Sequence, residues 1–295
     1  INPLIKAFNA VGYDAMTLGN HEFNFGAQIF STLGQATFPM LQANLEDDGS
    51  YGIAAIPVED YVEKTIGPEA IDIAILGIGN HRVPNYELPS NIPGLTFTDP
   101  IAKTQELADL LNPTNDVVIA LTHIGFTEDP KSVEVDANVD TNLAAVTTGV
   151  DVIIGSHSHT NPTTGYGDYK FLPTIVGSAD NVPVLINQAY RYNTFLGEVV
   201  LGMRAKTGGG YEVAARGARF GAARLRHDLR ASGVGEEIIE AVLPADAGEE
   251  IARAREVWRR RFDAPATDRA GFARQARFLQ GRGFAMDVIR KVLKE

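Results

Sequence analysis

VVIALTHIG at residues 117–125 and VDVIIGSHSH at residues 150–159 are the two stretches that decide the fold of this chain. Each begins as a short apolar run rich in β-branched residues, which predicts a buried strand, and each ends in a polar loop that carries histidine. Residues 70–78 and 183–187 are apolar runs of the same kind and also predict strands.

Helical patterns lie between these runs. Residues 100–111 (PIAKTQELADLL) have the spacing of an amphipathic helix, and Pro100 suits its first turn. Residues 138–148 are a second candidate helix. Strands that alternate with helices predict a layered α/β domain.

The chain changes composition near residue 217. Residues 1–218 carry 10 Lys and Arg against 25 Asp and Glu, whereas residues 219–295 carry 16 against 12. Asparagine occurs 16 times before residue 219 and never after it. The change follows the glycine-rich run 207–210, which is typical of a flexible connection. We therefore expect two modules of different origin, 1–216 and 217–295.

Polar motifs follow three apolar stretches in the first module, at residues 19–23 (GNHEF), 122–125 (THIG) and 155–159 (GSHSH). Ligands gather at the carboxyl ends of strands in α/β sheets. Imidazoles, an amide oxygen and carboxylates suit Zn, Mn or Fe. On an extended segment His157 and His159, two residues apart, would face the same site. A single histidine near a strand end more often only hydrogen-bonds, but three such loops favour a metal site.

These motifs resemble those of the calcineurin-like metallophosphoesterases, in the same order along the chain. The stretch VGYDAMTLGNHEF at residues 11–23 resembles the 5′-nucleotidase branch in particular, which includes the 2′,3′-cyclic-nucleotide phosphodiesterases. The resemblance covers about residues 1–216. It implies a layered α/β/β/α domain that hydrolyses nucleotide phosphoesters with divalent metal ions.

The resemblance also implies a role for each motif residue. One metal would be held by Asn20, His123 and His157, and His159 would belong to a second metal. His21 would be the catalytic histidine, stabilising the phosphoryl transition state or protonating the leaving oxygen. Many relatives orient that histidine with an Asp, whereas this chain has Asn24, and an amide gives less support to an imidazolium.

The first motifs of the family, Asp-x-His and a Gly-Asp pair, do not occur in the 18 residues before Gly19. In the family they supply further ligands, including the Asp that bridges both metals. The usual C-terminal substrate domain is not found either. The sequence is therefore expected to be a fragment or processed form with an incomplete dinuclear site, one ion instead of two, and impaired turnover.

The second module contains an internal repeat with a period of 50 residues, in which 223–234 matches 273–284. Each unit predicts a helix, a glycine stop and a second short helix, and between the two units 248–262 predicts an Arg-rich helix. The run RFLQGRGF at residues 277–284 resembles the RecX family of recombinase regulators, built from tandem three-helix repeats. This resemblance implies binding to RecA–DNA filaments through basic residues. The candidates are Arg224, Arg226, Arg259, Arg260 and Arg261.

Three interpretations of function remain open. The chain is a nucleotide phosphoesterase, a RecX-like regulator of RecA filaments, or a chimeric reading frame with no joint function. The arginines are equally consistent with a solvated face of a helical bundle. The first family is commonly exported and the second cytoplasmic. No apolar run approaches the roughly 20 residues of a membrane span, and the chain has no cysteine, which excludes thiolate metal sites and disulfides.

Overall fold

The structure, a computed structural model, describes residues 3–52, 58–127, 137–160, 173–189, 197 and 199–217, together with many of the positions between 251 and 294. It divides into two compact units, residues 1–197 and 198–295. Each unit has a hydrophobic core of its own. The boundary expected from composition lies at 216/217, some way beyond this division, and stays a prediction.

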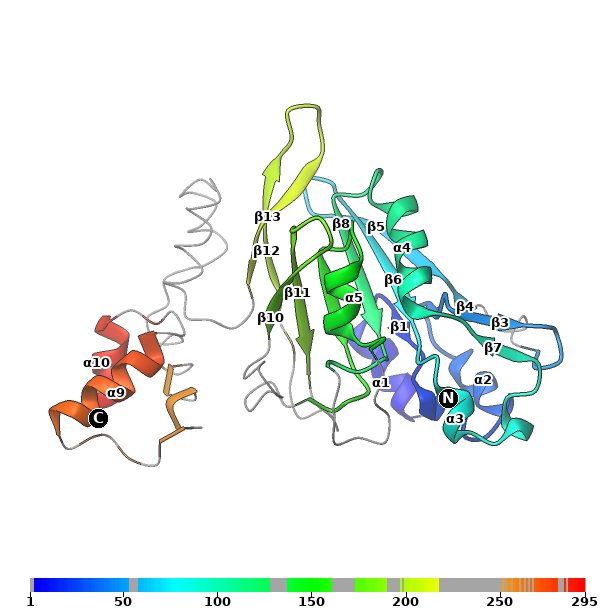
Figure 1. The fold of residues 1–295 in the computed structure, drawn as a ribbon, viewed down its shortest axis with the longest axis horizontal. Helices are drawn as coiled ribbons and strands as arrows, with labels where there is room; N and C mark the ends of the chain where they lie inside the picture. Colours follow the sequence, from blue (N-terminus) through cyan, green and yellow to red (C-terminus); the bar gives the residue numbers. More distant parts are fainter. Residues whose placement is uncertain are drawn as a thin grey trace. The chain divides into compact units, whose positions relative to one another are not determined.

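A six-stranded sheet forms the centre of the first unit (Figure 1). Its four inner strands are parallel, and each edge strand runs antiparallel to its neighbour. In order across the sheet the strands are β10 (Thr174–Gly177), β11 (Pro183–Gln188), β9 (Val152–Gly155), β8 (Val117–Thr122), β6 (Ile71–Ile78) and β5 (Tyr61–Ile66). The four strands predicted from sequence are the four parallel ones, with ends that differ by at most two residues.

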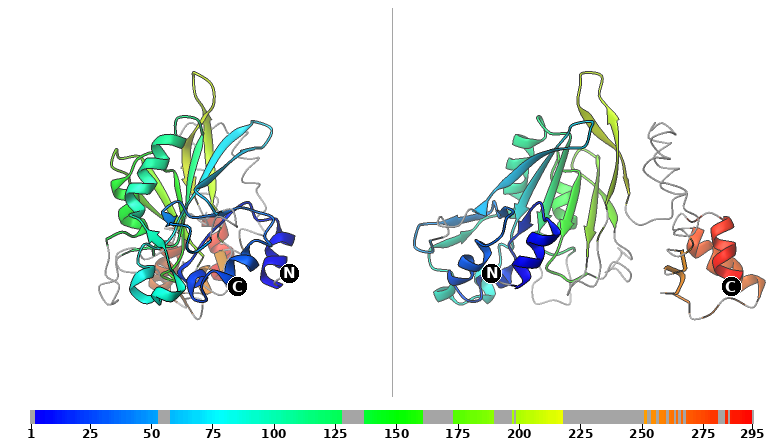
Figure 2. Two further views of the ribbon diagram at one scale, coloured as in Figure 1. Left: turned by 90° about the vertical axis from the view of Figure 1, so that its right-hand side faces the viewer. Right: turned by 180° about the vertical axis from the view of Figure 1, so that it is seen from behind.

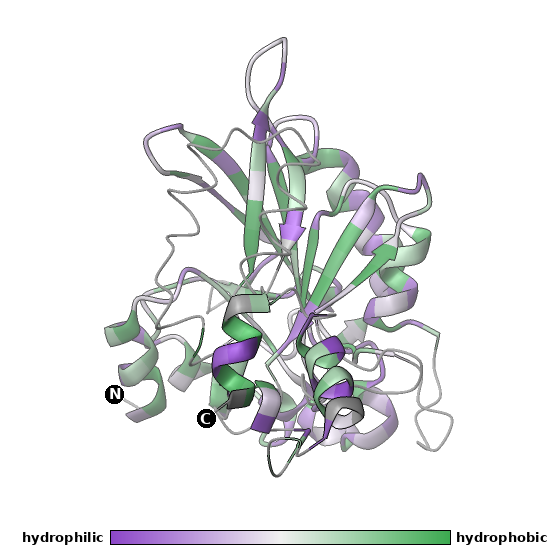
Figure 3. Ribbon diagram, turned by 90° about the vertical axis from the view of Figure 1, so that its left-hand side faces the viewer, coloured by the Kyte–Doolittle hydropathy of each residue, from purple (hydrophilic) through white to green (hydrophobic). Residues whose placement is uncertain are grey.

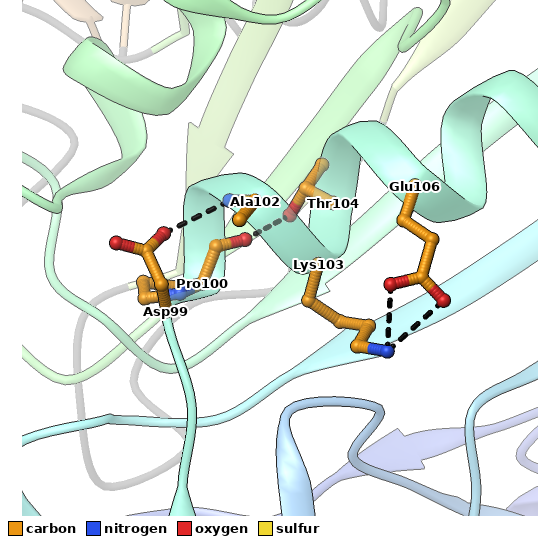
Figure 4. A network of polar contacts seen from close by, with 6 residues as sticks. All are labelled: Asp99, Pro100, Ala102, Lys103, Thr104 and Glu106. Atoms are coloured by element: carbon orange, nitrogen blue, oxygen red, sulfur yellow. Dashed lines mark hydrogen bonds and ion pairs between the residues drawn. The ribbon is translucent and has the colours of Figure 1, made fainter.

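Two helices, α4 (Pro100–Leu111) and α5 (Asp140–Val146), pack on one face of this sheet. Asp99 begins α4 by accepting hydrogen bonds from the backbone N–H group of Ile101 at 2.8 Å and from that of Ala102 at 2.9 Å. Figure 4 shows the second of these bonds. The predicted helix at 100–111 is confirmed. The helix expected at 138–148 is shorter, because Val139 and Thr147 on either side have extended backbones.

A smaller parallel sheet of β1 (Met16–Thr17), β2 (Met40–Leu41) and β4 (Val58–Glu59) packs against β6 and β8. Only Asp60 separates β4 from β5, so one stretch of chain serves both sheets. Two helices, α1 (Pro3–Val11) and α2 (Gln28–Leu33), lie on the other side of the sheets from α4 and α5 (Figure 2). The expected α/β/β/α layering is therefore confirmed.

Short elements complete the first unit. They are the 3-10 helices η1 (Asn20–Phe23) and η3 (Pro89–Asn91), the helix α3 (Val83–Tyr86), and the antiparallel pair β3 (Leu45–Asp47) and β7 (Leu95–Phe97). The strands of the large sheet are mostly hydrophobic (green in Figure 3), and their buried side chains pack against α4 and α5. A second cluster joins α1, α2 and η1 through Ile5, Phe30 and Phe23.

The second unit contains the hairpin of β12 (Val200–Ala205) and β13 (Tyr211–Gly217) and the helices α9 (Arg269–Gln280) and α10 (Met286–Lys294). The helices share a core in which the Trp258 indole N–H donates to Gln275 Oε1 at 3.0 Å. Gln275 Nε2 in turn donates to the Ala264 carbonyl oxygen at 3.0 Å, so this buried amide has partners on both sides. The earlier helical repeat, 223–243, lies outside the described residues.

Gly77 shows how closely the two sheets approach each other. A Cβ at this position would lie 2.2 Å from Leu41 Cβ and 2.6 Å from the Leu41 carbonyl carbon. Because backbone atoms of β2 cannot retreat cheaply, we expect Gly77→Ala to lower the free energy of unfolding by more than about 2 kcal/mol, measured by urea denaturation. The control is Gly177→Ala on the edge strand β10, where a Cβ meets nothing within 4 Å. Equal effects of the two substitutions would contradict this account of the packing.

Candidate metal centre

Three of the predicted metal ligands meet at one point. Asn20 lies just beyond β1, His123 follows β8 and His157 follows β9. Asn20 Oδ1 is 2.9 Å from His123 Nε2 and 3.1 Å from His157 Nδ1. The centroids of the two imidazole rings are 5.2 Å apart. The sheet topology thus brings one amide oxygen and two imidazole nitrogens together, as the motifs predict.

Gly19 permits this close approach. A Cβ at residue 19 would lie 2.8 Å from His123 Cε1 and 2.8 Å from Glu22 Oε2. Glu22 Oε2 accepts a hydrogen bond from the Gly19 backbone N–H at 2.7 Å. Burial raises the pKa of the Glu22 carboxyl, partly offset by that hydrogen bond. The Glu22 carboxyl therefore caps η1.

The loop after β9 is not the extended segment assumed from the sequence. His157 and His159 both have positive φ, 74° and 49°, a conformation that is costly for residues other than glycine. The argument that alternation makes the two side chains face one site is therefore wrong here. Gln188, at the end of β11, supports the loop by donating to the Ser156 carbonyl oxygen at 3.1 Å and accepting from the Thr160 backbone N–H.

The hydrogen bonds of Ser156 determine where the His123 proton lies. The Ser156 hydroxyl donates its single proton to the Thr122 carbonyl oxygen at 2.8 Å. At the same time Ser156 Oγ lies 2.7 Å from His123 Nδ1, so it must accept a hydrogen bond from that nitrogen. Burial, followed by the neighbouring charges of His157, His21 and His159, lowers the pKa of His123 to about 3. His123 is therefore neutral at pH 7, with the proton on Nδ1 and a lone pair on Nε2.

This arrangement fits a bound cation. The Nε2 lone pair of His123 points at Asn20 Oδ1, which is also an electron-pair donor, and the two would repel each other without a positive charge nearby. Turning the Asn20 amide over would offer its NH2 group to the rings, which is the arrangement that a metal-free cluster favours. Among the described residues no three His, Cys, Asp or Glu side chains form a metal-holding group. The donors here are instead two imidazoles and an amide.

The remaining predicted residues differ in where they lie. His21 is exposed, and its Nδ1 is 2.7 Å from Asn24 Oδ1. His159 is exposed as well, and its assignment to a second metal stays a prediction. Arg259 and Arg261 are exposed in the second unit. Arg224, Arg226 and Arg260 lie outside the described residues.

Sequence reasoning did not identify several residues that support the site. Ser156 and Gln188 were assigned no role, and Asp140 lay in a segment expected only to be helical. Asp140 is fully buried, and its Oδ1 accepts from the Thr122 hydroxyl at 2.5 Å. A Cβ on Gly155 would lie 2.0 Å from Asp140 Oδ2, so this strand end requires glycine. Burial is the main cause that raises the Asp140 pKa well above its usual range.

Comparison with known proteins gives the family. Residues 1–161 match the calcineurin-like phosphoesterase domain. The chain belongs to the calcineurin-like phosphoesterases. Proteins of this family use divalent metal ions, in agreement with the donor set around Asn20. Residues 248–293 match the third three-helix domain of RecX, so the chain joins a phosphoesterase domain to a RecX-like region.

Among curated proteins, this phosphoesterase is 35% identical over 198 residues to the 5′-nucleotidase of Bos taurus and 33% identical over 207 residues to a snake venom 5′-nucleotidase of Gloydius brevicauda. These alignments cover 64% and 66% of the chain but 32% of each relative. The chain thus spans about a third of the length of the curated relatives it matches.

Solved structures show the same fold. A 5′-nucleotidase precursor from Thermus thermophilus has a TM-score of 0.59 and 26% identity, covering 72% of this phosphoesterase and 39% of that chain. The calcineurin-like phosphoesterase YfkN of Bacillus subtilis has a TM-score of 0.57 and 23% identity, covering 81% and 75%. In the described part of the chain no helix is both long and apolar enough to cross a bilayer.

The buried Asp140 leads to a prediction about stability and pH. The native protein keeps the Asp140 proton to higher pH than the unfolded chain does. Above the unfolded pKa the unfolded chain binds fewer protons, so the free energy of unfolding falls as pH rises toward the native pKa. We expect Asp140→Asn to reduce this fall between about pH 5 and about pH 8 in chelator-treated protein, measured by urea denaturation. Asp109→Asn, at an exposed position on α4, should leave the slope unchanged. An unaltered slope in Asp140→Asn would contradict the prediction.

Proposed function

We propose that this chain hydrolyses phosphoesters of nucleotides with a divalent metal ion, as a 5′-nucleotidase or a 2′,3′-cyclic-nucleotide phosphodiesterase. The observation that carries the proposal is the meeting of Asn20 Oδ1 with the His123 and His157 nitrogens at 2.9 and 3.1 Å. The similarity to the bovine and snake venom 5′-nucleotidases supports the nucleotide as substrate.

Each residue of the site has a role that follows from its position. Asn20, His123 and His157 would hold one ion, with Zn, Mn or Fe suited to this mixture of imidazole and amide donors. When bound, the ion supplies a Lewis acid that polarises a phosphoryl oxygen and lowers the pKa of a bound water. Ser156 holds His123 in the tautomer whose Nε2 can bind.

His21 is the residue that we assign to the reacting phosphate. Its ring is exposed and next to Asn20 in the chain, and Asn24 holds its Nδ1 edge. Its Nε2 edge is therefore the one available to a phosphoryl oxygen or to the leaving oxygen. A positioned histidine of this kind contributes roughly a hundredfold or more to phosphoryl and acyl transfers by hydrogen bonding or proton transfer.

Hydrolysis of a 5′-nucleotide, a 2′,3′-cyclic nucleotide and bis-p-nitrophenyl phosphate with added Mn²⁺ or Zn²⁺ tests the proposal. Only His159 among the described residues is assigned to a second ion, so we expect slow turnover, roughly a thousandfold below a complete two-metal site. Asn20→Ala and His123→Ala should abolish turnover and Mn²⁺ binding by calorimetry. Asn112→Ala, at an exposed asparagine that ends α4, is the matched control. Metal-dependent turnover that survives in Asn20→Ala and His123→Ala would refute the site.

A second function is carried by a separate observation, the match of residues 248–293 to the third three-helix domain of RecX. We propose that this region binds a recombinase filament through exposed arginines. Arg259 and Arg261 are both exposed beside the helical core that contains Trp258. Arginine suits such a contact because its planar guanidinium binds phosphates and carboxylates bidentately.

The filament proposal predicts that the chain slows RecA ATP hydrolysis on single-stranded DNA, weakly because only part of the repeat array matches. Replacing Arg259 and Arg261 together by Ala should remove this effect. The control is the double variant Lys6→Ala/Lys64→Ala in the first unit, which changes the charge equally. Inhibition that is equal in both double variants would show that these arginines are only a solvated face.

A further inference from the structure

The side chain that holds His21 is itself held by a carboxylate. Asn24 Oδ1 lies 2.7 Å from His21 Nδ1, and Asn24 Nδ2 donates to Glu87 Oε2 at 2.6 Å. Asn24 follows η1, whereas Glu87 follows α3, so 63 residues of sequence separate the two. His21, Asn24 and Glu87 thus form a continuous chain of hydrogen bonds that leads away from the exposed imidazole.

Glu87 is fixed by further donors on its other oxygen. Glu87 Oε1 accepts from the Leu88 backbone N–H at 2.9 Å and from Asn91 Nδ2 at 2.9 Å. Asn91 Nδ2 also donates to the Asn24 carbonyl oxygen at 2.9 Å, which ties the two loops together. The hydrogen bond from Asn91 is the main cause that lowers the pKa of the Glu87 carboxyl, and those from Leu88 and Asn24 add to it.

An ionised carboxylate can only accept hydrogen bonds. The acceptor role of Glu87 therefore determines which atoms donate and which accept at Asn24 and at His21. Because Glu87 accepts, the amide of Asn24 must turn its NH2 group toward Glu87. The Asn24 oxygen then faces His21, so His21 Nδ1 must carry a proton. A lone Asn24 would fit the ring in either orientation, since its oxygen and nitrogen ends differ little in shape.

We propose that Glu87 is a positioning residue that sets the tautomer of His21 through Asn24. The neutral ring then carries its proton on Nδ1 and can take up a second proton at Nε2. The resulting imidazolium donates from Nε2 to a phosphoryl oxygen or to the leaving oxygen while Asn24 Oδ1 still accepts from Nδ1. A carboxylate in direct contact with the histidine would accept a hydrogen bond from Nδ1. Glu87 has the same effect through Asn24, one hydrogen bond further away. The consequence for turnover rests on the proposed phosphoesterase function, whereas the tautomer itself does not.

Glu87→Gln is a sharp test because a glutamine has only one oxygen. Two donors, Leu88 N–H and Asn91 Nδ2, surround the Oε1 position, and one, Asn24 Nδ2, faces the Oε2 position. The glutamine oxygen should therefore take the Oε1 position and its NH2 group should face Asn24. Asn24 must then turn over and offer its own NH2 group to His21 Nδ1, which requires the proton to move to Nε2.

The measurement is the tautomer of His21 by nitrogen NMR of the whole chain labelled with ¹⁵N-histidine, in chelator-treated protein, with His21→Gln used to assign the signals. We expect the Nδ1–H form in the unsubstituted chain and the Nε2–H form in Glu87→Gln. The double variant Asn24→Asp/Glu87→Gln should return to the Nδ1–H form, because the introduced carboxylate accepts from both neighbours. Glu106→Gln, at an exposed carboxylate paired with Lys103 at 2.8 Å, is the control for the charge change.

Turnover of bis-p-nitrophenyl phosphate with Mn²⁺ gives a second readout. We expect kcat to fall roughly tenfold in Glu87→Gln, because an Asn24 NH2 group facing Nδ1 opposes the imidazolium that gives its Nε2 proton to the leaving oxygen. KM should change less than about twofold, and kcat should recover in the double variant. An Nδ1–H ring in Glu87→Gln, or failure of the double variant to restore that form, would overturn the inference. If no variant and no unsubstituted chain turns over substrate, the proposed function fails, and the NMR result alone decides the role of Glu87.

Discussion

The parallel pairing of β8 with β9 is the constraint on which the candidate metal centre depends. Leu121 lies opposite Ile154 in this pairing, so two residues later His123 comes beside Ser156, and His157 follows at once. A slip of one residue would exchange the two faces of the strand and separate the imidazole from the hydroxyl that fixes its tautomer. The register itself is held by burial, because Ala120 and Ile153 face the core on α4 and α5. The apolar half of each motif therefore positions the polar half.

Much of this arrangement was predictable from residues alone. The four parallel strands and α4 have strong local patterns, and polar loops at the carboxyl ends of parallel strands must lie at one edge of the sheet. The meeting of His123 and His157 follows from that topology, whereas Asn20 comes from the loop after β1 in the other sheet. The small sheet of β1, β2 and β4 was not predictable, since strands of two residues have no readable periodicity.

Other features depend on contacts between distant parts of the chain. The backbone of His157 and His159 is left-handed in a loop that Gln188 contacts from another strand, and no local pattern signals this. Glu87 resembles any polar residue after a short helix, and only folding brings it to Asn24. Asp140 looks like a helix-starting residue, yet it contacts Thr122 beside the predicted ligand His123. Ser156, Gln188, Asp140 and Glu87, which contact the predicted site residues or their neighbours, were therefore the ones that the sequence could not reveal.

These residues also determine which way the side chains of the site are turned. Imidazole rings and carboxamides can each turn over and exchange a donor for an acceptor. Their orientation must therefore be set by a reference group, one that can only accept or only donate. For His123 the reference is the Thr122 carbonyl oxygen, which forces Ser156 to donate away from the ring. For His21 it is the Glu87 carboxylate, which forces Asn24 to present its oxygen. In both series of hydrogen bonds the last group can only accept a hydrogen bond. The side chain between it and the histidine, Ser156 or Asn24, must therefore donate to that group and accept from the histidine. The same rule explains why an asparagine suffices beside His21, provided that a carboxylate stands behind it.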